Sequence, residues 1–283
     1  MPNFLRTLLL LGAAAVLAGM LGWLVGGVPG ASAAAALALG GGGLACLFGE
    51  RLVLRLYGAR ELDAESDPHL SAMVCELAGR AGLPAPQVFL LDTPAANAFV
   101  VGHGRAHVAL VLTRGILRLL DERELRAVLA HEFAHILRGD VLPGTLAAVF
   151  GGLLAALSQG GLVPPAEERS VRAGAVAHNP LWWLLGPLAA LFAQVGAAAR
   201  RELAADRLGA ALCGDRAAMA SALQHLHDHA QATRGFPQAG RYPAGVQMMV
   251  CDPLRGGGVY RLFRCHPPVA CRLQALREPE AAS

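Results

Sequence analysis

The sequence predicts a mainly α-helical membrane protein with four transmembrane helices and one α+β domain. Two observations support this fold class. Hydrophobic residues make up 54% of the 283 residues and charged residues only 16%, whereas soluble domains usually carry about a quarter charged residues. The apolar residues are also gathered into long uncharged blocks, which is the pattern of membrane spans.

The first uncharged block covers residues 7–49, which contain no Asp, Glu, Lys, Arg or His. A membrane span needs about 20 apolar residues, so this block has room for two helices. The stretch GGVPGAS at 26–32 contains the Gly and Pro residues that break a helix, and we expect spans near 5–26 and 32–50. A cleaved signal peptide is the alternative for the first span, but its apolar core is too long and a second span follows at once.

A second apolar region begins at residue 141. The stretch TLAAVFGGLLAALSQGGLV at 145–163 is long enough for a third span, and PLWWLLGPLAALFAQVGAAA at 180–199 for a fourth. Pro187 predicts a kink in the fourth span. The alternative for this pair is a set of buried core helices or a re-entrant hairpin, which the high Gly content leaves open.

The arginines near the span ends predict the orientation in the membrane. The connections at 26–32 and 164–179 carry no excess of basic residues, whereas the opposite ends carry Arg6, Arg51, Arg55, Arg60, Arg138, Arg200 and Arg201. By the positive-inside rule both termini face the cytoplasm. The predicted organisation is two spans in 1–50, the first part of a cytoplasmic domain in 51–140, a transmembrane hairpin in 141–199 and the second part of the domain in 200–283.

The cytoplasmic segments have an α+β pattern. Apolar residues at helical spacing predict helices at 69–82, 121–139, 197–213 and 219–231, and short apolar runs bounded by turn residues predict strands at 86–93, 97–102 and 107–113. The helix at 121–139 opens on Asp121 with Glu124 three residues later, a capping box, and ends at Gly139.

The stretch LAHEFAHILRGD at 129–140 contains the strongest chemical signal. His131 and His135 lie four apart, so on a helix both can present a ring nitrogen to one metal ion. Neutral imidazoles suit zinc, and Glu132 lies about 100° around the helix, where it can hold a water as general base. The alternative reading is two surface histidines on an amphipathic helix.

A catalytic zinc also needs a third protein ligand and an open position. The best candidate lies in ARRELAADRLGA, where Glu202 and Asp206 stand four apart on one helical face. Glu202 would bind the metal, and Asp206 would accept a hydrogen bond from the outer nitrogen of a ligand histidine. The spacing is equally consistent with an acidic pair balanced by Arg200, Arg201 and Arg207.

HEFAH followed by RGD and an apolar hairpin, then RELAADR, then FRCHPPVACRLQALR resembles the HtpX family of membrane-bound zinc metalloproteases. The resemblance covers nearly the whole chain, and the more distant CaaX prenyl endopeptidases fit less well. It implies a zincin-like metalloprotease domain with one Zn²⁺ bound by His131, His135 and Glu202. Glu132 would then be the base, Asp206 the partner of a ligand histidine, and His266 a stabiliser of the oxyanion.

The resemblance also implies a substrate-binding edge strand that pairs with an extended substrate backbone. This strand consists of Asn97, Ala98, Phe99, Val100, Val101 and Gly102. Two positions depart from the family pattern, because Cys265 replaces a Thr or Ser and Ala199 replaces an Arg. Neither is one of the implied metal ligands.

These observations and the resemblance together predict a zinc endopeptidase of the bacterial cytoplasmic (inner) membrane, with its catalytic domain in the cytoplasm. The resemblance implies misfolded or damaged membrane proteins as substrates, a role in the stress response, and the lipid bilayer and other membrane quality-control proteases as partners. Nothing resembles a nucleic-acid-binding stripe. The alternative function is a non-catalytic zinc-binding scaffold. His225 and His229 in HLHDH are more typical of a solvated helix than of a metal site.

Overall fold

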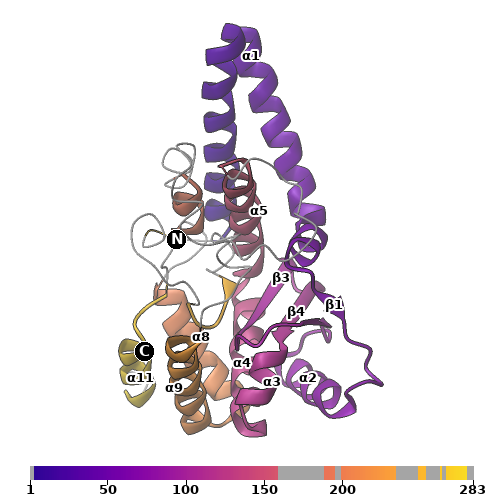
Figure 1. Cartoon of the computed structure of the whole chain (residues 1–283), viewed down its shortest axis with the longest axis vertical. Coiled ribbons are helices and arrows are strands. Elements are labelled where there is room, and N and C mark those ends of the chain that lie inside the picture. The colour runs from indigo at the N-terminus through magenta and orange to yellow at the C-terminus, as the bar shows by residue number, and fades with distance from the viewer. Residues whose placement is uncertain are drawn as a thin grey trace.

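The computed structural model describes residues 3–158, 188–194, 199–233, 248–252, 262 and 266–278. A helical hairpin extends along the long axis, and a small sheet with its surrounding helices lies at the base of this hairpin (Figure 1). The chain is mostly helical, as predicted for a mainly α protein with an α+β domain.

Helix α1 (Asn3–Tyr57) forms this hairpin and is interrupted at Gly26 and Gly27. Gly27 has φ +59°, a left-handed conformation that glycine adopts without steric cost. The two arms touch beyond this break, because a Cβ added to Gly22 would lie 2.3 Å from the Gly30 carbonyl oxygen. The turn predicted at 26–32 therefore begins where expected, and Pro29 lies at the start of the second arm, where its missing N–H is no loss.

The hairpin has an exposed apolar surface. Among the described residues, α1 is the one helix long and apolar enough to cross a membrane by itself, and only 11% of its most apolar stretch is buried. Helix α4 (Glu122–Arg138) and α5 (Val141–Ser158) pass the same test only as a pair bent by 95°. The four predicted spans are thus not confirmed, and most of the fourth, at 180–199, lies outside the described residues.

The sheet has four strands in the order β1-β2-β4-β3. They are β1 (Arg60–Glu61), β2 (Gln87–Leu91), β3 (Ala98–His103) and β4 (His107–Thr113), with β2 parallel and β3 antiparallel to β4. Side chains alternate between the two faces of a strand. On β3, Ala98 and Val100 therefore pack towards α4 and α2 (Pro68–Ala81), whereas Phe99 and Val101 pack towards α1 and α5.

Helix α4 packs against one face of the sheet and is capped at both ends as the sequence predicts. The Asp121 side chain accepts from the Glu124 N–H and the Glu124 side chain accepts from the Asp121 N–H, which is a capping box. Gly139 ends the helix with φ +69°. The short helix α3 (Arg114–Leu119), which the sequence analysis did not predict, leads into α4.

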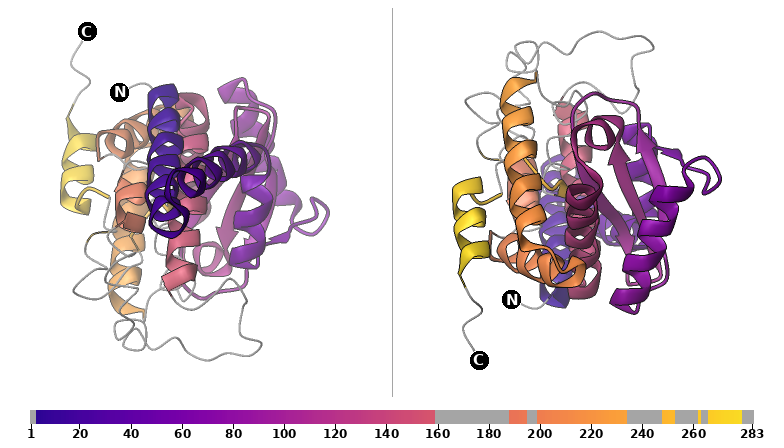
Figure 2. Two further views of the ribbon diagram at one scale, coloured as in Figure 1. Left: turned by 90° about the horizontal axis from the view of Figure 1, so that it is seen from above. Right: turned by 90° about the horizontal axis from the view of Figure 1, so that it is seen from below.

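Three further helices lie along the other side of α4. Viewed along the long axis, α8 (Ala199–Cys213), α9 (Arg216–Ala232) and α11 (Val269–Arg277) lie on one side, and the strands and α2 on the other (Figure 2). Helix α8 approaches α4 closely at Gly209, where an added Cβ would lie 2.8 Å from the backbone nitrogen and Cα of His131. Glycine at this position therefore sets the distance between the two helices.

Gly209→Ala is expected to lower the free energy of unfolding by about 1–3 kcal/mol, because the methyl group meets backbone atoms that have little freedom to move. The matched control is Gly79→Ala in α2, where an added Cβ meets no atom within 4 Å. That change should be neutral or stabilising by about 0.5–1 kcal/mol. Thermal unfolding in detergent measures both, and equal effects of the two substitutions would contradict the close approach.

Candidate metal centre

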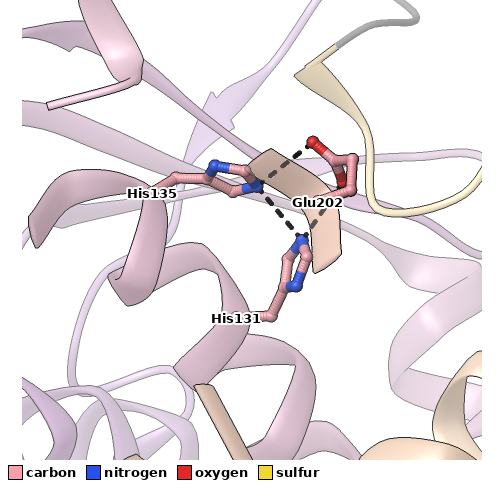
Figure 3. A group of neighbouring side chains, drawn as sticks. All are labelled: His131, His135 and Glu202. Carbon is pink, nitrogen blue, oxygen red and sulfur yellow. Dashed lines mark hydrogen bonds and ion pairs between the residues drawn. The ribbon is translucent and has the colours of Figure 1, made fainter. Parts of the chain in front are cut away.

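Three side chains from two helices converge beside the sheet (Figure 3). His131 and His135 lie one turn apart on α4, and Glu202 lies in the first turn of α8. The two Nε2 atoms are 3.2 Å apart, and the Glu202 oxygens lie 3.7 Å from His131 Nε2 and 3.6 Å from His135 Nε2. Within the described residues, this is the one group of three such side chains close enough to hold a metal ion.

The second nitrogen of His131 faces Asp206, the residue predicted to be its partner. His131 Nδ1 lies 2.9 Å from Asp206 Oδ1, which leaves Nε2 directed at the cluster. Arg272 of α11 donates to both oxygens of Asp206, at 2.7 and 2.6 Å. Burial raises the pKa of Asp206, but the Arg272 charge and hydrogen bonds outweigh it and hold this pKa well below its usual range.

The second nitrogen of His135 faces a carboxylate that the sequence analysis missed. Asp140 directly follows Gly139, which caps α4. Its Oδ2 lies 3.4 Å from His135 Nδ1. Asp140 also accepts hydrogen bonds from Arg138 Nε and Arg201 Nη1, both at 3.2 Å. Burial raises the pKa of Asp140, but His135 and the arginines outweigh it and lower the pKa to about 2.

The pKa values of the two histidines are shifted in opposite directions. Burial lowers the pKa of His131 and outweighs the opposing effect of Asp206, which favours the neutral imidazole that metals require. Burial also acts to lower the pKa of His135, but Glu202 and Asp140 outweigh it and raise this pKa. The Glu202 pKa is lowered, because His135, His266 and His131 outweigh the effect of its burial.

Glu132 is fully buried next to the cluster. Burial raises the pKa of its carboxyl group to about 8, against the opposing effect of His135. His266 lies beside Glu202, with Nε2 3.8 Å from Glu202 Oε2 and a side chain that is 5% exposed. Neither ring nitrogen of His266 has a hydrogen-bond partner in the described part of the chain, so the ring can donate to or accept from a further group.

Strand β3, predicted to bind substrate, lies beside this cluster, but much of its outer edge already has partners. The Ala98 carbonyl accepts from the Val250 N–H at 3.0 Å, and Phe99 forms an antiparallel bridge with Met249. The N–H and carbonyl of Gly102 both bond to the Thr145 hydroxyl of α5, at 3.0 Å each. Pairing with a substrate along all six predicted residues would require these internal partners to be displaced.

Asn97, the first residue of the predicted substrate strand, is buried and bonds to the protein's own backbone. Its side chain is buried, donates to the Cys251 carbonyl at 2.8 Å and accepts from the Cys251 N–H at 3.4 Å. Val100 is the strand residue that lines a small open pocket next to the cluster. The other lining residues are His135, Asp140, Val141, Gly144, Arg201, Glu202 and Met248.

The histidines of HLHDH have ordinary structural partners. His225 Nδ1 lies 2.9 Å from Glu124 Oε1, and His229 Nε2 lies 3.1 Å from the Pro94 carbonyl. Both contacts join α9 to neighbouring elements, which agrees with the reading of these histidines as helix-surface residues. Cys265, the position that departs from the family pattern, lies outside the described residues.

Comparison with known proteins agrees with this arrangement. Residues 64–280 match the model of peptidase family M48. The chain is 38% identical to a protease HtpX homolog of Paraburkholderia phytofirmans and 40% identical to one of Ralstonia pickettii, over 98% of this chain and 97% of each relative. It is 41% identical to a protease HtpX homolog of Ralstonia nicotianae, over 98% and 96%.

Among solved structures, the crystal structure of S. mikatae Ste24p is similar, with 17% sequence identity and a TM-score of 0.39. The match covers 83% of this chain and 56% of the Ste24p chain. The family match includes the α4 and α8 residues of the cluster, and the HtpX relatives are matched over nearly their full length. The chain therefore belongs to peptidase family M48 and is a membrane-associated metalloprotease.

Proposed function

We propose that the chain is a zinc-dependent endopeptidase that uses Glu132 as its general base. The observation that supports this is the convergence of two imidazole nitrogens and a carboxylate beside a fully buried glutamate. Tetrahedral zinc, with bonds of about 2.0–2.1 Å, places neighbouring donor atoms about 3.3–3.4 Å apart. The separations of 3.2, 3.6 and 3.7 Å fit that geometry, and the histidine and glutamate donors suit zinc.

When bound, zinc lowers the pKa of water towards about 7 and polarises the scissile carbonyl. Glu132 lies on the same helix as His131 and His135 and is shielded from solvent. It accepts the proton of the attacking water and then delivers it to the leaving amine. His266, whose ring nitrogens have no other partner in the described chain, donates a hydrogen bond to the developing oxyanion.

For localisation, we propose the bacterial inner membrane, with four spans and the metal centre on the cytoplasmic side. The exposed apolar hairpin α1 supports membrane insertion, and the arginines near the predicted span ends support the orientation. The family assignment favours misfolded or damaged membrane proteins as substrates, in a stress response shared with other quality-control proteases. The extended substrate would lie beside β3 next to the pocket that Val100 lines.

Glu132→Gln in the full-length protein tests this function. The amide cannot take up the proton of water, so cleavage of an unfolded membrane protein should fall by at least about 100-fold, while bound zinc stays unchanged. His225→Gln is the control, because His225 pairs with Glu124 away from the cluster; it should leave both readings unchanged. Unchanged cleavage by Glu132→Gln would contradict the mechanism, and zinc binding without any cleavage by the wild-type protein would favour the scaffold alternative.

A further inference from the structure

Each histidine of the cluster contacts a carboxylate that in turn contacts an arginine. His131 is followed by Asp206 and then Arg272, and His135 is followed by Asp140 and then Arg201. In each set the histidine offers Nδ1 to a buried carboxylate, and a buried arginine holds that carboxylate from the other side. Since Nδ1 faces a carboxylate in both rings, both Nε2 atoms are directed at the cluster.

The second set differs from the first in what it connects. Asp206 lies on α8, one turn after Glu202, whereas Asp140 lies at the junction between α4 and α5. Arg201, the partner of Asp140, directly precedes Glu202 at the start of α8. Asp140 therefore contacts the last histidine of α4 on one side and, through Arg201, the backbone that carries Glu202 on the other.

The position of Asp140 is held by the backbone as well as by its side chain. Gly139 ends α4 in the left-handed conformation, and the Asp140 N–H then donates to the His135 carbonyl at 3.0 Å. Arg138 adds a hydrogen bond to the same carboxylate at 3.2 Å. Together these contacts hold the carboxylate below the edge of the His135 ring, next to the pocket that Asp140 and Arg201 both line.

We propose that Asp140 is a positioning residue of the metal centre. It orients the His135 imidazole through Nδ1 and, through Arg201, fixes the start of α8 so that Glu202 faces the two histidines. This inference rests on the proposed metal-binding function of His131, His135 and Glu202. Partners of ligand histidines fix the tautomer and ring direction, and their loss typically lowers metal affinity by about 10–100-fold.

The test is the zinc affinity of the purified full-length protein in detergent, measured by competition with a chelating dye. Asp140→Ala is expected to lower the affinity by about 10–100-fold. Asp140→Asn keeps an oxygen that accepts from His135 Nδ1, so it should restore most of the affinity. Asp121→Ala is the matched control, because it removes the cap at the other end of α4 and should weaken the helix without changing zinc affinity.

Arg201→Met supplies a second test that leaves the Asp140 carboxylate in place. Arg201→Met should also lower zinc affinity. The double variant Arg201→Met/Asp140→Ala should bind zinc as tightly as Asp140→Ala alone, because the two residues act in one chain of contacts. Affinities within about twofold of wild type for Asp140→Ala and Arg201→Met, or an equal loss in Asp121→Ala, would overturn the proposal. A wild-type protein that binds no zinc would instead overturn the proposed function.

Discussion

Glu202→Ala is expected to lower the zinc affinity of the protein by more than about 100-fold, because loss of a ligand should cost more than the 10–100-fold loss of a ligand's partner. Glu202 is the acidic member of the cluster, and its oxygens lie within 3.7 Å of both imidazole nitrogens. Without it two histidines remain, whereas a catalytic zinc site usually has three protein ligands. Zinc content after dialysis, measured with cleavage activity, is the direct readout.

Glu65→Gln is a suitable control for this substitution. Glu65 is exposed in the loop before α2 and far along the chain from the cluster, so its loss should leave zinc content and cleavage unchanged. Full zinc occupancy in Glu202→Ala would remove Glu202 from the set of ligands. In that case the carboxylate would serve only to balance the charge of the buried histidines.

Arg272→Met is expected to be the most destabilising single substitution considered, at about 3–5 kcal/mol. Arg272 is 2% exposed and donates to both oxygens of Asp206 and, at 2.6 Å, to the Val250 carbonyl. Removing the guanidinium leaves the Asp206 charge buried with His131 as its remaining partner. For a domain of 150–250 residues this corresponds to a fall of about 6–20 °C in the unfolding midpoint.

Arg207→Met tests whether the loss is specific to the buried pair. Arg207 also lies in this region but is partly exposed, and its ion pair with Glu278 is 3.7 Å long; the expected change is within about 0.5 kcal/mol. Thermal unfolding of both variants in one detergent gives the comparison. Similar midpoints for Arg272→Met and wild type would show that Asp206 does not depend on Arg272.

The local elements of the fold were predictable because their signals are local. The Asp121 and Glu124 capping box and Gly139 bound α4 in the sequence as in the structure. The strands β3 and β4 have continuous apolar runs, as expected for strands buried on both faces. Helix α11 was missed because it is short and lies among residues with few helix signals. The two-residue strand β1 is too short for any periodic pattern.

The two proposed ligand histidines and Glu132 were predictable because they lie within five residues on one helix. Glu202 required the family resemblance, since about 70 residues separate it from His131 and His135 and spacing alone left its role open. Asp140 and Arg201 were missed because their contact depends on how α8 returns to the end of α4. Arg272 did leave a signal, because it shares a helical face with the buried residues Ala275 and Leu276.

The partners along the outer edge of β3, the predicted substrate strand, could not be predicted from the strand's own sequence. The sequence identifies β3 as an apolar strand, but its outer neighbours come from the Met249–Cys251 region and from Thr145 of α5. These partners are distant in sequence and have no motif of their own. A β-augmentation site predicted from a strand therefore requires knowledge of everything that packs along its edge.

The start of α1 also limits how far a substrate must travel. The Asn3 side chain donates to the Arg138 carbonyl at 2.7 Å, so the apolar hairpin begins at the last turn of α4. His135 lies three residues earlier, which is about 4.5 Å along a helix axis. An extended chain advances about 3.3 Å per residue. If the hairpin lies in the bilayer as proposed, a polypeptide that leaves the membrane beside it needs only a short unfolded segment to reach His135.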